Sequence, residues 1–175
     1  MKRLHKDQRG FSIIELLVVI VLTALITTAV TTTFFQVFNI NARTANHMSA
    51  LSQVQQAGKE VSKDTLQAQT VNATGSQGFP LTLTWVEWGT NQTNSVNYTL
   101  EDVPSGLKEL QRSHSINSTE PTVIRVAQYI DPYQTSCSWN NVTRMLTFTV
   151  TATVGNGPYE AIETRIYEIE PRPGS

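Results

Sequence analysis

Residues 9–20 of the chain have the sequence RGFSIIELLVVI. In this stretch a basic and a small residue come first, a single carboxylate, Glu15, follows, and an aliphatic run begins directly after it. No charged residue occurs from Leu16 to Ala42, a run of 27 residues. The 20 residues from Phe11 to Val30 would span about 30 Å as a helix, which matches the hydrocarbon core of a bilayer. The stretch therefore predicts a membrane-spanning helix.

The formal net charge of −1 conceals an uneven distribution of charge. Residues 1–10 carry four basic residues and one acidic residue, a net charge of +3, whereas the other 165 residues carry nine basic and 13 acidic residues, a net charge of −4. A basic segment before an apolar run predicts that the leader is cytoplasmic and that the C-terminal part is extracytoplasmic. Because the body of the chain is acidic, no nucleic-acid partner is evident.

Three interpretations of the apolar segment compete. A secretory signal peptide is disfavoured because the apolar run is long and no small-x-small cleavage site follows it. A plain single-pass anchor, with the threonines bonding back to the helix backbone, remains open. The third interpretation starts from Glu15, since a carboxylate costs about 2.5–3.5 kcal/mol near the middle of a membrane helix and less near its ends.

A cation at the same depth would offset the cost of Glu15. Cleavage between Gly10 and Phe11 would create an α-ammonium group four residues before Glu15. The amine of one copy could then pair with the Glu15 carboxylate of a neighbouring copy that is shifted along the helix axis. Such a pair would neutralise both charges in hydrocarbon and set the axial register of a stack of helices.

The RGFSIIELLVVI stretch resembles the cleavage and methylation motif of type IV prepilins and type II secretion pseudopilins. The resemblance implies that a prepilin peptidase cuts after Gly10 and methylates the amine of Phe11, and that Glu15 serves in subunit assembly. It also implies three further partners, namely the membrane, an inner-membrane assembly platform and other pilins or pseudopilins in a helical filament. Pilins often carry a helix-breaking Pro or Gly within this segment, but Thr23 to Thr33 contain neither.

The chain beyond the apolar run has a helical and then a strand periodicity. Apolar residues recur at helical spacing with polar residues between them, and they are Met48, Leu51, Val54, Gly58, Val61 and Leu66. One helix from Phe11 to about Thr70 is therefore expected, with Gly58 allowing close approach to a sheet and residues 72–78 forming a turn-rich linker.

From residue 81 onward the apolar residues alternate with polar ones, which predicts an antiparallel meander. Strands are expected at 81–88, 96–100, 107–111, 122–130, 143–154 and 159–169, with a loop at 131–142. In the 143–154 strand the residues expected to face one way are Leu146, Phe148, Val150, Ala152 and Val154. The fold class is α+β and pilin-like, a long helix packed on an antiparallel sheet.

The pattern divides the chain into five segments. These are a basic leader peptide at 1–10, a transmembrane or assembly helix at 11–38, an amphipathic helix at 39–71, an antiparallel β domain at 72–170 and a tail at 171–175.

No constellation of residues in the body predicts an enzyme. The single cysteine, Cys137, excludes an intrachain disulfide and a cysteine-built zinc site, and it is either a buried small residue or a free thiol. Asp102, His114 and Ser115 form a triad only on paper, and Asp131 indicates a turn rather than a calcium site. We therefore expect no catalytic residues, metal or cofactor.

Two tryptophans allow a different function. Trp85 and Trp88 are three residues apart, which places them on opposite faces of a strand. One is expected in the core, and the other could contact a partner such as a sugar or single-stranded DNA.

The sequence thus favours a structural subunit, and a minor one, of a type IV pilus or a type II secretion-like pseudopilus, located in the cytoplasmic membrane and then in the filament. Residues 53–56, 62–64 and 68–71 resemble those of a J-type minor pseudopilin or a related minor pilin. The alternative is a membrane-anchored extracytoplasmic binding module, an adhesin or a DNA-uptake receptor.

Overall fold

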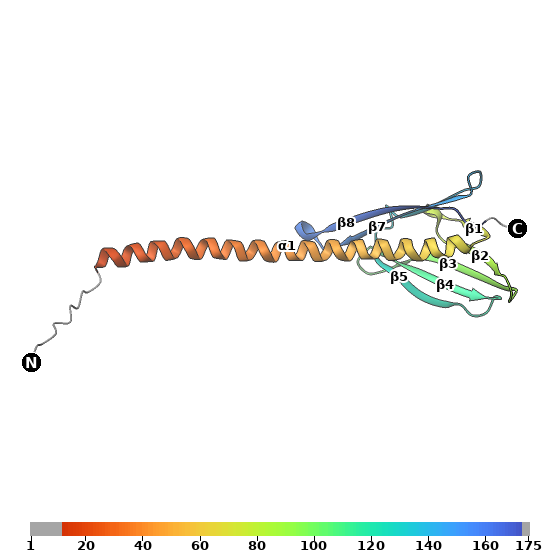
Figure 1. Ribbon diagram of the computed structural model, residues 1–175, viewed down its shortest axis with the longest axis horizontal. Helices are drawn as coiled ribbons and strands as arrows, with labels where there is room; N and C mark the ends of the chain where they lie inside the picture. Colours follow the sequence, from red (N-terminus) through yellow and green to blue (C-terminus); the bar gives the residue numbers. More distant parts are fainter. Residues whose placement is uncertain (1–11, 173–175) are drawn as a thin grey trace, which may run out of the picture. The chain divides into compact units, whose positions relative to one another are not determined.

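The computed structural model describes residues 12–172, and it consists of one long helix and eight strands within that range (Figure 1). Helix α1 comprises Ile13–Gln67, 55 residues, without an interruption at the threonine-rich segment. The chain divides into two compact units between Ala42 and Arg43, and each is described by itself.

The first turn of α1 explains why the helix begins where it does. The Ser12 carbonyl accepts hydrogen bonds from the backbone N–H groups of Glu15 (3.0 Å) and Leu16 (3.2 Å). Ser12 and Glu15 have the S-x-x-E spacing of a capping box, and a carboxylate in the first turn interacts favourably with the helix dipole. Glu15 therefore favours the helix start locally, whatever else it does.

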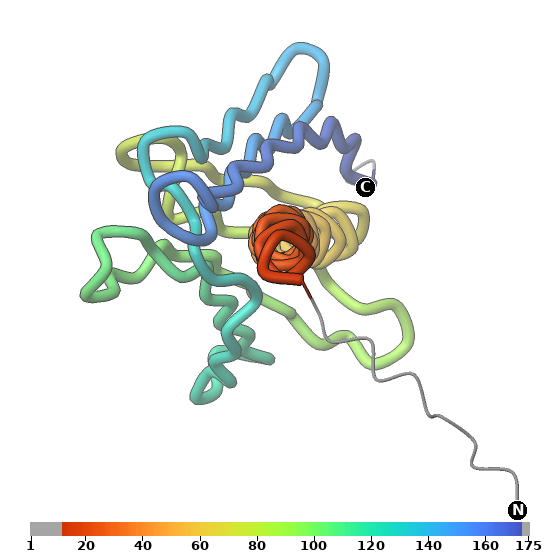
Figure 2. The backbone as a smooth tube through the Cα atoms, turned by 90° about the vertical axis from the view of Figure 1, so that its left-hand side faces the viewer, coloured from red at the N-terminus to blue at the C-terminus, as the bar shows by residue number. Residues whose placement is uncertain are grey.

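The strands form a single antiparallel sheet in the order β1-β2-β3-β4-β5-β7-β6, with β8 on the other edge of β7. Their bounds are β1 Thr70–Ala73, β2 Leu81–Glu87, β3 Gln92–Asp102, β4 Lys108–Ile116, β5 Thr122–Ile130, β6 Ser136–Asn140, β7 Met145–Val154 and β8 Ala161–Ile169. The sheet curls around the C-terminal part of α1, so that strands lie on more than one side of it (Figures 1 and 2). This arrangement confirms the α+β, pilin-like fold class.

The curl originates in β5. Its register with β4 shifts around Leu110, and Tyr129 has a φ of 59°, in the left-handed region. Strand β5 then contacts β7 through one backbone pair, Ile130 with Ala152. Because register shifts of this kind increase local twist, β5 bends and joins two sections of the sheet, β1–β5 and β6–β8.

The core lies between α1 and the concave face of the sheet. The inward residues of β7 (Leu146, Phe148, Val150, Ala152 and Val154) are all buried, which confirms the predicted alternation. The buried face of α1 differs in part from the expectation. Met48 and Leu66 are 61% and 57% exposed, because they are 18 residues apart, five full helical turns, and share the opposite face. The residues that fill the buried face are Ala50, Val54, Ala57, Gly58, Val61, Asp64 and Thr65.

Two predicted loops contain short strands. The expected loop at 131–142 includes β6, whose Cys137 and Trp139 pair with Phe148 and Leu146 of β7. The predicted linker at 72–78 begins inside β1, because α1 ends at Gln67 and Thr70–Ala73 pair with β2. The two strands have only four and five residues, so their alternation is too short to predict a strand, and pairing with a longer neighbour forms them.

Gly58 makes the close contact predicted for it. A Cβ at this position would overlap the ring of Tyr167 on β8. The Tyr167 hydroxyl donates a hydrogen bond to the Val54 carbonyl on α1 (3.2 Å), one turn before Gly58. The absence of a side chain at residue 58 therefore lets β8 cover the helix.

Candidate functional site

The predicted cleavage and assembly residues lie at the start of the chain. Glu15 is in the first turn of α1 with an exposed side chain. Gly10 and Phe11 lie outside the described residues. The arrangement of the three residues thus stays a prediction from the sequence.

The helix that follows Glu15 is apolar enough to cross a membrane, and within the described residues it is the one helix that meets this criterion. Six threonine hydroxyls in its apolar part each donate a hydrogen bond to the backbone carbonyl four residues earlier, at 2.7–3.0 Å. The donors are Thr23, Thr27, Thr28, Thr31, Thr32 and Thr33. Because these hydroxyls are satisfied within the helix, the threonines are compatible with hydrocarbon, as the sequence predicts.

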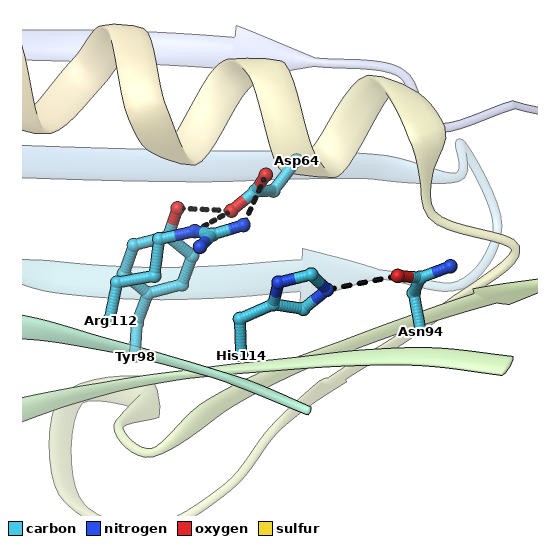
Figure 3. Close-up of polar contacts among 5 residues, drawn as sticks. All are labelled: Asp64, Asn94, Tyr98, Arg112 and His114. Carbon is cyan, nitrogen blue, oxygen red and sulfur yellow. Dashed lines mark hydrogen bonds and ion pairs between the residues drawn. The ribbon is translucent and has the colours of Figure 1, made fainter. Parts of the chain in front are cut away.

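A buried ionic cluster joins α1 to the sheet in the C-terminal unit (Figure 3). The Asp64 carboxylate of α1 accepts hydrogen bonds from the Arg112 Nε (2.6 Å) and Nη2 (3.2 Å) of β4. It also accepts one from the Tyr98 hydroxyl of β3 (2.6 Å). The side chains of Asp64 and Arg112 are only 3% and 15% exposed. Asp64 thus connects the last turn but one of the helix to two neighbouring strands.

The surroundings of the cluster stabilise a charged arginine and a neutral tyrosine. Burial, followed by the adjacent Asp64 carboxylate, raises the pKa of the Tyr98 hydroxyl well above its usual range. The hydrogen bonding of the Arg112 guanidinium to the Asp64 carboxylate is the main cause that raises the pKa of Arg112. Such bidentate, charge-assisted bonds are strong and directional. Since the cluster is sealed from solvent and its charges are paired, it serves to fix the helix on the sheet.

Alkaline pH is expected to destabilise the domain through Tyr98. In the unfolded chain this tyrosine titrates near pH 10, whereas the folded protein keeps the hydroxyl protonated to higher pH. The folded state then binds more protons, so the free energy of unfolding falls by about 1.4 kcal/mol per pH unit above pH 10.

Urea unfolding of the detergent-solubilised protein between pH 8 and 11, followed by tryptophan fluorescence, measures this slope. Burial also raises the pKa of the Cys137 thiol, so the comparison with Tyr98→Phe isolates the contribution of the tyrosine. An equal slope in the Tyr98→Phe variant would contradict the assignment.

Asp102, His114 and Ser115 do not come together as a catalytic triad. The His114 Nε2 pairs with the Asn94 Oδ1 at 2.9 Å (Figure 3), and its ring stacks on Trp85 with centroids 6.2 Å apart. Asp102 pairs with Lys108 (2.9 Å) at the opposite end of β3, and Ser115 lies opposite Ser95. The arrangement offers no nucleophile–base pair.

The other two candidate residues, Asp131 and Cys137, have structural roles. The Asp131 carboxylate accepts hydrogen bonds from the Tyr133 N–H (2.8 Å) and the Gln134 side chain (3.0 Å), so it closes a turn as predicted. Residues 12–172 contain no group of three or more His, Cys, Asp or Glu that could hold a metal ion. Cys137 is a buried small residue, 5% exposed.

The two tryptophans differ in burial. Trp85 packs against the core, whereas Trp88, in the turn after β2, is 74% exposed. Trp85 packs against the core as expected for one of the two, but the prediction that they lie on opposite faces of one strand is wrong, because β2 ends at Glu87 and Trp88 follows it.

Comparison with known proteins gives one finding. Residues 5–31 match the family model described as the prokaryotic N-terminal methylation motif. The match supports a type IV pilin or pseudopilin. It covers residues 5–10 of the predicted leader, Glu15 and the apolar helix up to residue 31, and together with the fold it fits a membrane-anchored structural protein. No curated protein and no solved structure matches the chain.

The sequence analysis did not identify the buried cluster, although one signal for it exists. Asp64 lies three residues after Val61 and four before Ala68, so it interrupts an apolar stripe at helical spacing. A carboxylate in such a stripe indicates a buried ion pair. Its partners, 34 and 48 residues away, carry no comparable signal.

Proposed function

We propose that the chain is a minor structural subunit of a type IV pilus or a type II secretion-like pseudopilus, related to the J-type minor pseudopilins. A prepilin peptidase cleaves it after Gly10 and methylates the Phe11 amine. The observation that carries the proposal is the match of residues 5–31 to the methylation motif, with Glu15 in the first turn of an uninterrupted apolar helix.

In this proposal the leader at 1–10 is cytoplasmic and the helix at 11–38 anchors the subunit in the cytoplasmic membrane. An inner-membrane platform then moves the subunit into a helical filament of pilins. The rest of α1, which ends at Gln67, and the β domain that begins with β1 at Thr70 form the extracytoplasmic body, and 171–175 is a tail. The Glu15 carboxylate pairs with the Phe11 amine of a neighbouring subunit, which sets the axial register.

Glu15 also has the spacing of a helix-capping residue, so the experiment must separate the two roles. Glutamine retains a side chain that can complete a capping box but removes the charge, whereas aspartate retains the charge. Glu15→Gln is expected to leave expression, membrane insertion and leader removal intact and to reduce recovery in sheared filaments by about tenfold or more. Glu15→Asp should keep a larger share of the recovery. Equal recovery of Glu15→Gln and the native chain would contradict the assembly role.

Cleavage after Gly10 has its own test. Gly10→Val places a branched side chain where the peptidase requires a small residue, so the leader should remain attached. Mass spectrometry of the N-terminus should find residues 1–10 in the variant and a methylated Phe11 at the N-terminus of the native chain. An uncleaved native chain would reduce the protein to an anchored domain.

A binding module is the second candidate, and the exposure of Trp88 favours it. The Trp88 side chain lines two surface hollows. Gln69, Val86 and Glu87 also line both of them. Exposed tryptophans are frequent in binding sites. If binding is the main function, Trp88→Ala should abolish binding to a glycan array or to single-stranded DNA while filament recovery is unchanged.

A further inference from the structure

We propose that two oppositely charged patches in the C-terminal unit are the two sides of one contact between successive copies of this chain. The lysine stripe comprises Lys59 and Lys63 on α1. The acidic pair comprises Glu101 on β3 and Glu109 on β4. This inference rests on the proposed filament and adds to it which side chains join the soluble bodies.

The lysine stripe is exposed and has no ion-pair partner in the part of the chain that the structure describes. Lys59 and Lys63 are one helical turn apart, and like charges at this spacing destabilise a helix by a few tenths of a kcal/mol. Neither lysine makes an ion pair with another described residue, and the half-buried Glu60 next to Lys59 does not compensate them. Met48 and Leu66 extend the same face at its two ends and are 61% and 57% exposed.

The acidic pair places two like negative charges opposite each other on neighbouring strands. Glu101 and Glu109 are directly opposite each other in the β3–β4 register, and like charges in that position destabilise a sheet. Glu109, whose side chain is 21% exposed, pairs with the Arg125 Nη1 at 3.2 Å, and because the arginine side chain is 55% exposed, solvent screens part of this attraction. Glu101 has no cation among the described residues, because the neighbouring Lys108 pairs with Asp102.

The two patches lie on opposite sides of the layer formed by α1 and the β3–β4 pair. Tyr98 and Leu110 face the helix and are buried, so the alternation of strand residues directs Glu101 and Glu109 away from it. Val61 faces the sheet, and the exposed lysines point to the other side of α1. A contact between the patches therefore joins the front of one copy to the back of the next. Such a contact does not close into a two-fold dimer but propagates along an array.

A second copy fits this surface better than another partner does. Every copy carries both patches, and residues 11–175 have a net charge of −4, so two bodies repel each other overall, and a contact of the lysine stripe with the acidic pair offsets this repulsion. The Cβ atoms of the two residues in each patch lie within about 6 Å of one another. Flexible lysine side chains can therefore converge on both carboxylates at once.

Charge reversal in full-length chains tests the contact. K59E/K63E and E101K/E109K are each expected to lower recovery in sheared filaments about tenfold, and the four changes together are expected to restore most of it. E120K/E160K gives the same change of net charge as E101K/E109K at exposed positions and should keep native recovery. In each case leader removal and membrane level are measured as well, because they report on processing and folding separately.

A cysteine pair gives a second measurement that does not depend on charge. In a Cys137→Ala background, oxidation of cells carrying Lys63→Cys and Glu101→Cys together is expected to give a ladder of covalent multimers. Either cysteine alone should give at most dimers.

The outcomes separate this inference from the proposed function. If the native chain is cleaved and recovered in filaments but the reversals have no effect and no ladder forms, the contact is wrong and the filament proposal stands. If only K59E/K63E lowers recovery, the lysines bind another partner, such as an anionic lipid headgroup, and the contact between copies is overturned. If the native chain is neither cleaved nor recovered in filaments, the proposed function fails first.

Discussion

Replacing Asp64 by alanine is expected to lower the free energy of unfolding of the C-terminal domain by about 3–5 kcal/mol. The substitution removes the acceptor for the Arg112 guanidinium and for the Tyr98 hydroxyl. Because the Arg112 side chain is only 15% exposed, its charge would remain in a site where water replaces the carboxylate poorly. The loss should exceed that for any exposed ion pair of the domain.

Urea unfolding of the detergent-solubilised protein measures this change, since Trp85 and Trp139 pack against the core and report on it by fluorescence. Asp64→Asn keeps an acceptor for Tyr98 without the charge and should give an intermediate loss. Asp102→Ala is the matched control, because Asp102 also pairs with a basic residue but its side chain is 90% exposed. Its loss should stay within about 1 kcal/mol. Equal losses for Asp64→Ala and Asp102→Ala would show that the buried cluster adds no stability.

The fold class could be predicted because its signals are local and strong. The uncharged run after Glu15 predicts the helix, and the alternation from Leu146 to Val154 predicts the central strand. Strand β6 was not predicted, because only two of its five residues, Cys137 and Trp139, face the core, and they do so through pairing with β7. Met48 and Leu66 are predicted on the wrong face because a spacing of five residues, as from Val61 to Leu66, turns the helix by about 140°, and Met48 lies five full turns before Leu66.

The candidate site has the same limit: a role carried by residues that are close in the sequence can be predicted, whereas a contact between residues far apart in the sequence cannot. Gly10, Phe11 and Glu15 lie within six residues of one specific motif, so the sequence alone predicts their role. Gly10 and Phe11 lie outside the described residues. The cluster of Asp64, Tyr98 and Arg112 depends on side chains far apart in the chain. Only the register of β3 with β4, which pairs Tyr98 with Arg112, brings them together.

Gly58→Ala is expected to destabilise the domain by about 1–3 kcal/mol, although alanine favours a helix interior over glycine by about 1 kcal/mol. The new Cβ would overlap the Tyr167 ring. This ring is held by its hydrogen bond to the Val54 carbonyl (3.2 Å) and by stacking on Phe148, with centroids 6.2 Å apart. It must move away from α1, and both contacts are lost with it.

A double-mutant cycle separates the steric effect from helix propensity. Tyr167→Ala removes the three ring atoms nearest to the new Cβ, so in that background Gly58→Ala should stabilise the domain by up to about 1 kcal/mol. The predicted change of sign between the two backgrounds is the measurement, taken from urea midpoints as for Asp64. Should Gly58→Ala stabilise the native background as well, the Tyr167 ring is not fixed on α1. The close approach of β8 to the helix would then not require glycine at position 58.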